Sequence, residues 1–335
     1  VVGMTVVTPT GVIETRALPA ASNGPDLNRL LVGSEGTFGV ITRATMRVHA
    51  IPEYEDYRML LFPTFQDGFA ALHECVQCGY MPSLARLSDE AETEFMFAAK
   101  HPATGFQRWI EGPAKKLLKA RGYGRPAALV LAFEGPRQLT LELRRGAMAI
   151  FKKHRTFDLG ASPGESWKES RYDVPYLRDF MMDYGAIADS FETSTVWSNL
   201  MRLYETSNEA LRRVIGDVTG FHGYIGSHIS HLYETGACLY YTIAVRCREG
   251  STPEEAIEQY SEIKRVATET FVSGGGALSH HHGVGYEHRP WIERELSERG
   301  LASLRQLKES LDPDGIMNPG GLLASEGPAR IDGSD

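Results

Sequence analysis

Short apolar runs alternate with longer segments of helical periodicity along this chain. Runs rich in β-branched and aromatic residues, bounded by glycine and proline, predict strands. We expect two strands within residues 2–15, and further strands at 40–42, 57–62, 84–87, 127–133 and 238–246. Apolar residues three and four positions apart predict helices at 65–78, 136–153 and 290–311.

One further helix has a clear start signal. Thr252 is a typical N-cap residue, Pro253 suits the first helical position, and Glu255 lies three residues after the cap. Strands and helices thus alternate from about residue 55 to about residue 275. This order favours an α+β module in which helices cover one face of a sheet.

The composition bounds the class of protein. With 335 residues, 42% of them hydrophobic and 23% charged, the chain is long enough for one or two cores. Its longest apolar stretches, such as 127–133, are far shorter than the roughly 20 residues of a membrane-spanning helix. The formal net charge of −8 argues against a nucleic-acid partner bound through its phosphates.

The four cysteines predict a reducing compartment and not a disulfide scaffold. Cys75 and Cys78 form a C-x-x-C pair, but Cys238 and Cys247 lie at the wrong spacing to complete a zinc site. We therefore expect Cys75 and Cys78 to be buried or half-buried thiols on a helix.

Three adjacent histidines, His280, His281 and His282, are the most unusual feature of the sequence, because glycines flank them at 274–276 and at 283 and 285. In an extended backbone His280 and His282 face one way and His281 the other. Adjacent histidines seldom converge on one metal ion, and a tag-like run is typical of a terminus. Acid/base chemistry or charge stabilisation near neutral pH is the interpretation we favour.

Other side chains are candidates for binding or proton transfer. Tyr240 and Tyr241 are neighbours in a predicted strand, so only one of them points beneath the sheet. Arg86 and Arg178 each follow an apolar run, and a guanidinium suits a phosphate or carboxylate, although either arginine alone is more typical of a surface ion pair. The glycine-rich loop 33–39 suits a phosphate or a heterocycle but matches no nucleotide-binding motif.

Two segments resemble the vanillyl-alcohol-oxidase or PCMH-type flavoproteins. Residues 32–42 resemble the last FAD-contacting element of that superfamily, and 312–320 resemble its C-terminal signature. Further strings resemble the alkyldihydroxyacetonephosphate synthase branch, and they are Val7-Thr8-Pro9-Thr10-Gly11-Val12-Ile13-Glu14, Gly24-Pro25-Asp26, Ser190-Phe191-Glu192-Thr193-Ser194, Gly236-Ala237-Cys238 and Leu278-Ser279-His280-His281-His282-Gly283-Val284-Gly285.

The resemblance implies an α+β fold in two parts. Residues 1–54 correspond to the C-terminal part of a PCMH-type FAD-binding domain, and 55–275 to a ferredoxin-like cap with an antiparallel sheet. Residues 276–325 are expected to return to the flavin site, and 326–335 to form a flexible tail. The loops that bind the FAD pyrophosphate are expected upstream of residue 1, which makes this chain a C-terminal portion.

The same resemblance implies a reaction and a set of site residues. In that branch a fatty alcohol replaces the acyl chain of acyl-dihydroxyacetone phosphate, with FAD forming an adduct at its N5 and no net redox change. Tyr240 matches the acid/base tyrosine, His280, His281 and His282 match histidines needed for activity, and Arg178 and Arg86 match substrate-binding arginines. The flavin-contacting residues implied are Gly33, Ser34, Glu35, Gly36, Thr37, Phe38, Gly39, Val40, Ile41 and Asn318. No metal ligand is implied.

The sequence also departs from this branch, and alternatives stay open. His228 stands where the family pattern has arginine, and Tyr241 where it has phenylalanine. A flavin-dependent 2-hydroxy-acid dehydrogenase is the main alternative, but residues 227–231 lack the Gly-Asp-Gly-Asn string of that branch and His281 replaces its glutamate. An FAD-linked oxidase of another alcohol and a non-catalytic lipid-binding cap are further alternatives.

The expected location is cytoplasmic. The chain has no charged-then-apolar leader at its start and ends in Gly333-Ser334-Asp335, without a peroxisomal tripeptide. An alkyl substrate favours peripheral contact with a membrane. The sequence leaves a homodimer open.

Overall fold

The computed structural model describes residues 1–98, 116–172 and 176–323. The chain divides into two compact units, one made of Val1–Ala50 with Ala277–Asp335 and the other of Ile51–Gly276. The tail predicted at 326–335 lies outside the described residues. No helix within the described ranges is long and apolar enough to cross a membrane.

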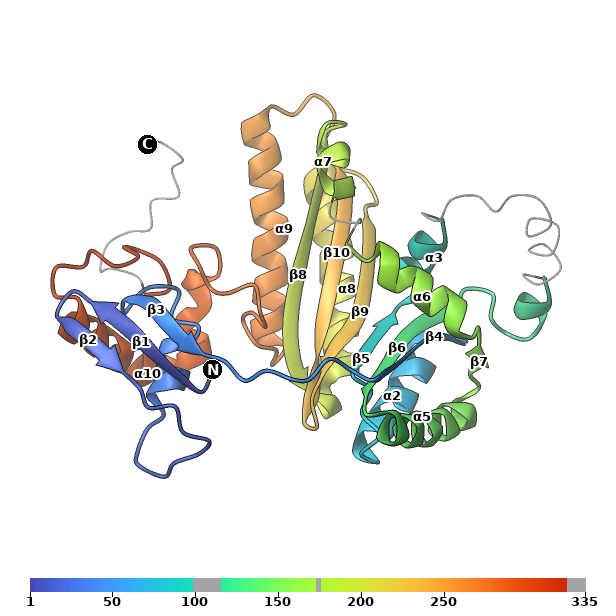
Figure 1. The fold of residues 1–335 in the computed structure, drawn as a ribbon. Coiled ribbons are helices and arrows are strands. Elements are labelled where there is room, and N and C mark those ends of the chain that lie inside the picture. The colour runs from blue at the N-terminus through green and yellow to red at the C-terminus, as the bar shows by residue number, and fades with distance from the viewer. Residues whose placement is uncertain (99–115, 173–175, 324–335) are drawn as a thin grey trace. The chain divides into compact units, whose positions relative to one another are not determined.

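The second unit is built on a seven-stranded sheet of order β7-β4-β6-β5-β9-β10-β8, in which all paired neighbours are antiparallel (Figure 1). Its strands are β4 (Tyr54–Phe62), β5 (Leu84–Ser88), β6 (Ala127–Gly135), β7 (Phe157–Asp158), β8 (Ala186–Val196), β9 (Tyr224–Leu232) and β10 (Gly236–Arg246). The α+β fold with an antiparallel sheet, predicted from the sequence, is confirmed.

This unit contains the same arrangement twice. The long helices are α2 (Phe65–Gln77), α5 (Arg137–Phe151), α8 (Trp197–Thr219) and α9 (Pro253–Ser273). The first half runs β4-α2-β5-β6-α5 and the second β8-α8-β9-β10-α9, with the third strand of each half lying between the other two. The halves join where β5 pairs with β9, so the middle of the sheet carries residues from both.

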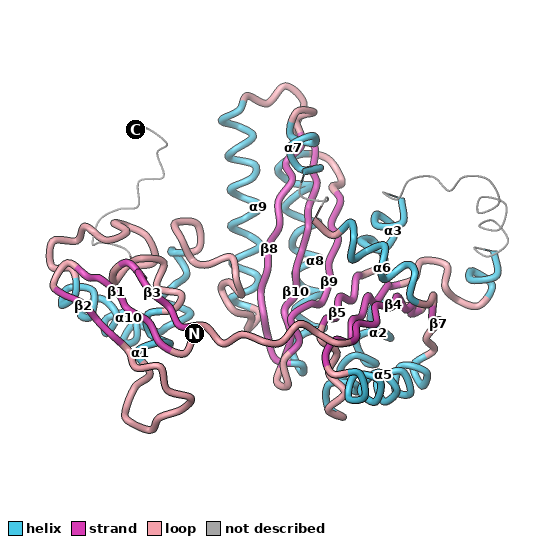
Figure 2. Tube along the Cα trace, viewed as in Figure 1, coloured by secondary structure: helices cyan, strands magenta, loops and turns pink. Residues whose placement is uncertain are grey.

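The four long helices pack on one face of the sheet. Leu87, Leu129, Leu239 and Tyr241 point into this layer and belong to one buried apolar cluster. The other face is partly covered by α3 (Glu90–Ala98) and α6 (Ala161–Ser170), which contact β9 and β4 respectively (Figure 2). The long helices thus cover one face, as predicted, and the short helices α3 and α6 on the other face had no clear signal in the sequence.

Helix α9 begins with the N-terminal cap that the sequence predicts. The Thr252 side chain accepts a hydrogen bond from Glu255 N (3.3 Å), and the Glu255 carboxylate accepts one from Thr252 N (2.8 Å). The thiol prediction holds for Cys75, which is buried on α2 and donates to the Tyr80 carbonyl (3.1 Å). Cys78, at the end of that helix, is exposed instead.

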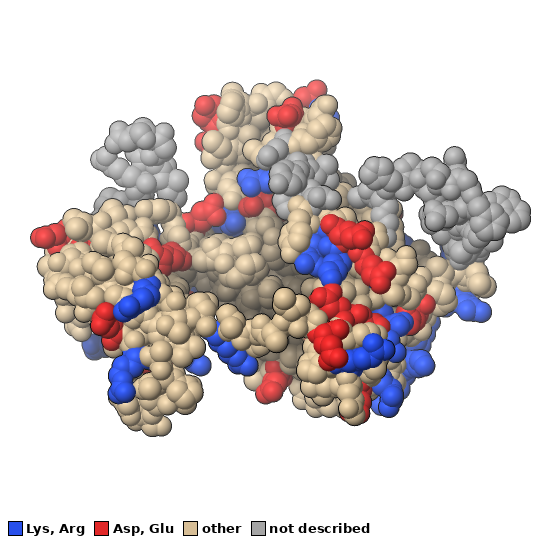
Figure 3. Space-filling view, in the orientation of Figure 1, with Lys and Arg blue, Asp and Glu red and all other residues tan. Residues whose placement is uncertain are grey.

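Charges on the second unit are interspersed. On the face shown in Figure 3, acidic and basic side chains lie next to one another around α5 and α6. Arg58 pairs with Asp56 and Asp158, and Lys168 pairs with Glu55. This face therefore carries mixed pairs and not a surface of one sign.

The first unit holds a three-stranded sheet of order β2-β1-β3, formed by β1 (Gly3–Thr8), β2 (Gly11–Glu14) and β3 (Val40–Thr45). Its helices are α1 (Leu27–Leu31) and α10 (Ile292–Leu311), the latter preceded by a 3₁₀ turn. The helix expected at 290–311 is interrupted at Ser297, whose φ of 64° kinks α10. All residues of β3 are exposed.

Candidate functional site

A row of polar side chains crosses the middle of the second unit's sheet. Ser88 on β5, His228 on β9, Tyr240 on β10 and Glu192 on β8 are direct cross-strand partners. Residues paired directly across antiparallel strands point to the same face. Tyr241 points to the opposite face, where it is 0% exposed and stacks on Phe271 at 5.4 Å. The choice that the sequence left open is settled: Tyr240, not Tyr241, lies on the polar face.

Tyr240 stands in a half-buried, charged environment. Its ring stacks on that of His228, with centroids 4.8 Å apart and planes at 23°. Burial raises the pKa of the Tyr240 phenol, Glu192 and Asp189 raise it further, and the Ser190 hydroxyl and Arg86 lower it. A proton on this phenol is therefore held more firmly than on a free tyrosine unless a nearby cation counters the burial.

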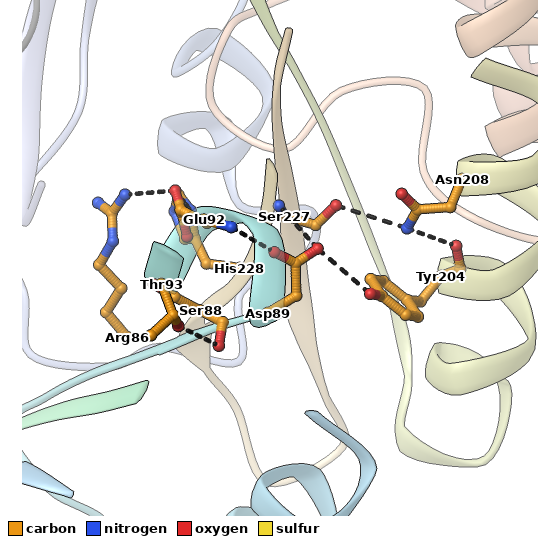
Figure 4. Close-up of polar contacts among 9 residues, drawn as sticks. All are labelled: Arg86, Ser88, Asp89, Glu92, Thr93, Tyr204, Asn208, Ser227 and His228. Atoms are coloured by element: carbon orange, nitrogen blue, oxygen red, sulfur yellow. Dashed lines mark hydrogen bonds and ion pairs between the residues drawn. The ribbon is translucent and has the colours of Figure 1, made fainter. Parts of the chain in front are cut away.

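Arg86 lies on the same face, two residues before Ser88. Its Nη2 donates to Glu92 Oε1 at 2.8 Å, and His228 Nδ1 lies 2.9 Å from the same oxygen (Figure 4). Burial tends to raise the pKa of the Glu92 carboxyl, but the charge of Arg86 and the hydrogen bond with His228 hold that pKa well below its usual range. Burial and the Arg86 charge lower the pKa of His228. At neutral pH the three groups thus carry one positive charge, one negative charge and a neutral ring.

Glu92 belongs to α3, which the sequence analysis did not assign, so its part in this cluster was missed. The only sequence signal is a glutamate six residues after Arg86, within a run of acidic residues that is otherwise typical of a solvated helix.

A second buried carboxylate, Asp89, stabilises the cluster formed by Arg86, Glu92 and His228. Its oxygens accept hydrogen bonds from Glu92 N (2.8 Å), Ser227 N (3.1 Å) and the Tyr204 hydroxyl (3.2 Å), as Figure 4 shows. Burial raises the pKa of Asp89 to about 7, and the charge of Glu92 acts in the same direction. Asp89 ties the start of α3 to β9 and α8, which fixes the helix that carries Glu92.

In the first unit, Glu35 organises the glycine-rich loop. Its backbone has a positive φ of 53°, and its carboxylate accepts hydrogen bonds from Val284 N (2.6 Å) and Gly285 N (2.9 Å). Asn318 Nδ2 donates to the Glu35 carbonyl at 2.7 Å. Three segments singled out from the sequence therefore meet at this loop: residues 33–39, the glycines after the histidine run, and the turn at Asn318.

Lys308 fastens the same loop to the C-terminal turn. It donates to the carbonyls of Thr37 (2.9 Å) and Met317 (2.6 Å) and pairs with the Asp312 carboxylate. Asp312 is 2% exposed, and although burial raises its pKa, Lys308 and the N–H groups of Met317 and Ile316 hold that pKa below its usual value. No pattern in the sequence marks Lys308.

The loop has features that fit part of a flavin. Gly33 and Gly36 have positive φ, and an added Cβ at either position would meet nothing within 4 Å. The Thr37 hydroxyl is buried without a hydrogen-bond partner among the described residues. Val40 and Ile41 are 54% and 45% exposed. Open backbone beside exposed apolar side chains and a buried hydroxyl suits a flat heterocycle with polar edges.

The three histidines do not alternate as they would in an extended strand. The backbone bends at His280, His281 and His282, and adjacent rings lie 5.3 and 4.8 Å apart. His280 Nδ1 and His281 Nδ1 are 3.1 Å apart, so one ring carries the proton and donates to the other. His281 and His282 are exposed and His280 is half-buried.

Arg178 lies exposed on the short helix α7 (Tyr176–Met182), which packs on β8. The structure therefore brings Arg86 and Tyr240 together around His228 in one unit. In the other unit it joins the segment after the histidine run to the glycine-rich loop and Asn318. The catalytic, substrate-binding and flavin-contacting roles of these residues stay predictions.

Comparison with known proteins gives a family. Residues 51–322 match the model described as FAD linked oxidases, C-terminal domain. The chain is 36% identical to the alkyldihydroxyacetonephosphate synthases of Trypanosoma brucei brucei, over 97% of this chain and 52% of the relative, and of Dictyostelium discoideum, over 96% and 52%. It is 26% identical to the mitochondrial cytochrome D-lactate dehydrogenase of Arabidopsis thaliana, over 96% and 52%.

Solved structures agree with this result. An alkyldihydroxyacetonephosphate synthase structure superposes with a TM-score of 0.73 and 32% identity, covering 95% of this chain and 53% of the other. p-Cresol methylhydroxylase, at 15% identity, shares the fold with a TM-score of 0.60, which confirms the predicted PCMH-type fold. The chain spans about half the length of the curated relatives it matches. Because residues 51–322 match the C-terminal domain of the FAD-linked oxidases, the chain belongs to that family.

Proposed function

We propose that the protein is an FAD-dependent enzyme that exchanges the acyl chain of acyl-dihydroxyacetone phosphate for a fatty alcohol. The observation that carries the proposal is the 36% identity to alkyldihydroxyacetonephosphate synthases over nearly the whole chain. The position of Tyr240 on a polar face beside Arg86 and His228 supports it, because the reaction needs a proton donor and acceptor near a cation.

The exchange balances without an outside oxidant. The bond between the dihydroxyacetone carbon and the acyl oxygen breaks, a bond from that carbon to the alcohol oxygen forms, and the proton of the alcohol accounts for that of the released fatty acid. When bound, FAD would supply the nucleophile for the exchange. Tyr240 would hold and return the proton next to the carbonyl, while Arg86 and Arg178 bind anionic groups of the substrate.

The histidines and the glycine-rich loop have separate parts in this proposal. His280, His281 and His282 would donate hydrogen bonds to the leaving carboxylate. Residues 33–41 and Asn318 would hold the flavin, through the loop that Glu35 and Lys308 keep in shape. The exposed rings of His281 and His282 suit that role, since a leaving group must reach them.

The test is an isotope exchange with the complete product of the gene that encodes this chain. Purified protein should be yellow and should incorporate labelled hexadecanol into acyl-dihydroxyacetone phosphate with release of unlabelled fatty acid. A yellow protein that oxidises D-lactate or glycolate and incorporates no alcohol would show the proposal to be wrong.

The second candidate is oxidation of a 2-hydroxy acid. It has specific support, since the family is that of FAD linked oxidases and a D-lactate dehydrogenase is 26% identical over 96% of the chain. The same purified protein distinguishes the two reactions, because bleaching of the flavin by D-lactate without oxygen occurs only in an oxidase or dehydrogenase. A protein that binds the lipid and does neither would be a non-catalytic lipid-binding cap.

The location and further partners also belong to the proposal. We propose a cytoplasmic protein that contacts membranes peripherally to collect its alkyl substrates, and that forms a homodimer. Co-sedimentation with vesicles of phosphatidylcholine tests the membrane contact. Light scattering tests the homodimer.

A further inference from the structure

Glu92 holds two of the candidate site residues through a single oxygen. Arg86 Nη2 and His228 Nδ1 both reach Oε1, at 2.8 and 2.9 Å. These contacts join β5 and the helix that follows it, α3, to the distant strand β9 (Figure 4). Neither the proposed reaction nor the resemblance to the synthases gives Glu92 a role.

Because the Glu92 side chain is buried, its charge depends on these two contacts for stabilisation. The side chains of Glu92 and His228 are 8% and 6% exposed, while that of Arg86 is 33% exposed. A carboxylate this buried is stabilised by its two partners and not by water. Arg86, in contrast, has water within reach, and its bond to Glu92 holds its guanidinium over the polar face.

The orientation of the His228 ring affects the orientation of the Tyr240 ring. The backbones of the two residues are fixed by direct pairing of β9 with β10, but the orientation of the imidazole ring depends on what Nδ1 contacts. With Nδ1 turned to Glu92, the ring lies nearly parallel to that of Tyr240 at 4.8 Å. Groups that face His228 are Arg86 from β5, Glu92 from α3, Tyr240 from β10 and His231 from its own strand.

We propose that Glu92 is a positioning residue of this site, which orients Arg86 directly and the Tyr240 ring through His228 without touching the substrate. The proposal rests on the proposed acid/base role of Tyr240. It predicts that a change at Glu92 is felt at Tyr240, although no contact between these two side chains is needed.

The first experiment reads Tyr240 itself in the chain as it stands, with 3-fluorotyrosine incorporated at position 240 and followed by fluorine NMR. Glu92→Gln keeps the size and an acceptor oxygen but removes the charge. Arg86 lowers the pKa of Tyr240, so its release into water should move the fluorine titration to higher pH. The fluorine shift should also move toward that of free fluorotyrosine as the stack on His228 loosens.

The matched control is Glu94→Gln, on the same helix. Glu94 is exposed and pairs with the exposed Arg125 at 3.2 Å, so its replacement should leave the Tyr240 titration unchanged. His228→Gln should move the fluorine shift in the same direction as Glu92→Gln. If Glu92→Gln does not fold, Glu92→Asp, which keeps the charge but has a shorter reach, should give the same direction of change. An unchanged titration and shift in the folded Glu92 variant overturns the proposal.

The second experiment measures exchange kinetics in the complete gene product. Loss of a residue that orients both Tyr240 and the substrate-binding Arg86 should lower kcat about tenfold, a fraction of what an acid/base group contributes, and should also raise KM. A rise in KM at constant kcat would mean that Glu92 acts on Arg86 and not on Tyr240, and would overturn the proposal. If the wild-type product shows no exchange at all, the proposed function fails, whereas the fluorine measurements still decide the role of Glu92.

Discussion

The Tyr240 hydroxyl can be removed without disturbing the stack that orients its ring. In the complete gene product, Tyr240→Phe should lower alcohol exchange by at least about 100-fold, since acid/base groups contribute that much, and should leave bound FAD unchanged. Tyr241→Phe is the matched control, because Tyr241 lies on the opposite face against Phe271. Exchange rates and the flavin absorbance check both points. Comparable losses in the two variants would contradict the assignment of Tyr240.

Asp89 should make the stability of the chain depend on pH. Burial raises its pKa from 3.8 to about 7, so the folded chain keeps a proton that the unfolded chain loses. The unfolded state therefore gains relative stability as pH rises from about 4 to about 7, by on the order of 2–4 kcal/mol. Asp89→Asn removes this group, and its free energy of unfolding should fall less over that window. Urea unfolding at several pH values measures the difference, and parallel curves for the two chains would count against it.

At the scale of single residues, groups with distinctive chemistry could be predicted from the sequence. Charged groups that matter because they are buried could not. Tyr240 and Arg86 were chosen by the resemblance, and the structure places both beside His228. Glu92 and Lys308 were missed because charged residues are usually exposed, and nothing in a sequence tells a buried carboxylate from a solvated one. Tertiary contacts alone decide which it is.

Two glycines in helices of the second unit should respond to alanine in opposite ways. Gly164 of α6 lies against the backbone of β4, where an added Cβ would stand 2.7 Å from Arg58 N. Gly164→Ala should force the helix away from the strand and destabilise the chain by about 1–3 kcal/mol. Gly216 of α8 has nothing within 4 Å of an added Cβ, so Gly216→Ala should stabilise by about 0.5–1 kcal/mol. Urea unfolding of both variants tests the pair, and equal shifts in one direction would contradict it.

The elements that the sequence predicted are those whose pattern matches their burial. All residues of β6 from Ala127 to Phe133 are buried, which gives a continuous apolar run, and α9 has its complete capping box. In contrast, β8 and β9 were not assigned, because Glu192 and His228 stand at buried positions and hide the alternation. The polar side chains of the candidate site, Glu192 and His228, are therefore the reason why these two strands were not predicted.

At the scale of the whole chain, the two units differ in how their cores are built. Every residue of the main buried apolar cluster, from Leu60 to Phe271, belongs to the second unit. The first unit draws its residues from both ends of the chain, and the bonds from Lys308 to Thr37 and from Asn318 to Glu35 join those ends. The second unit thus has a core of its own from one continuous segment.

Residues 51–276 should therefore fold when produced alone. The excised unit keeps its seven-stranded sheet, its four long helices and their shared core, so it should unfold in one cooperative urea transition. Residues 1–50 alone keep the three-stranded sheet but lose the α10 contacts to the glycine-rich loop, so they should show no such transition. Circular dichroism and urea titration compare the two pieces. A non-cooperative transition for 51–276 would mean that the sheet depends on the terminal segments, and the polar row around Tyr240 would then have to be studied only in the intact chain.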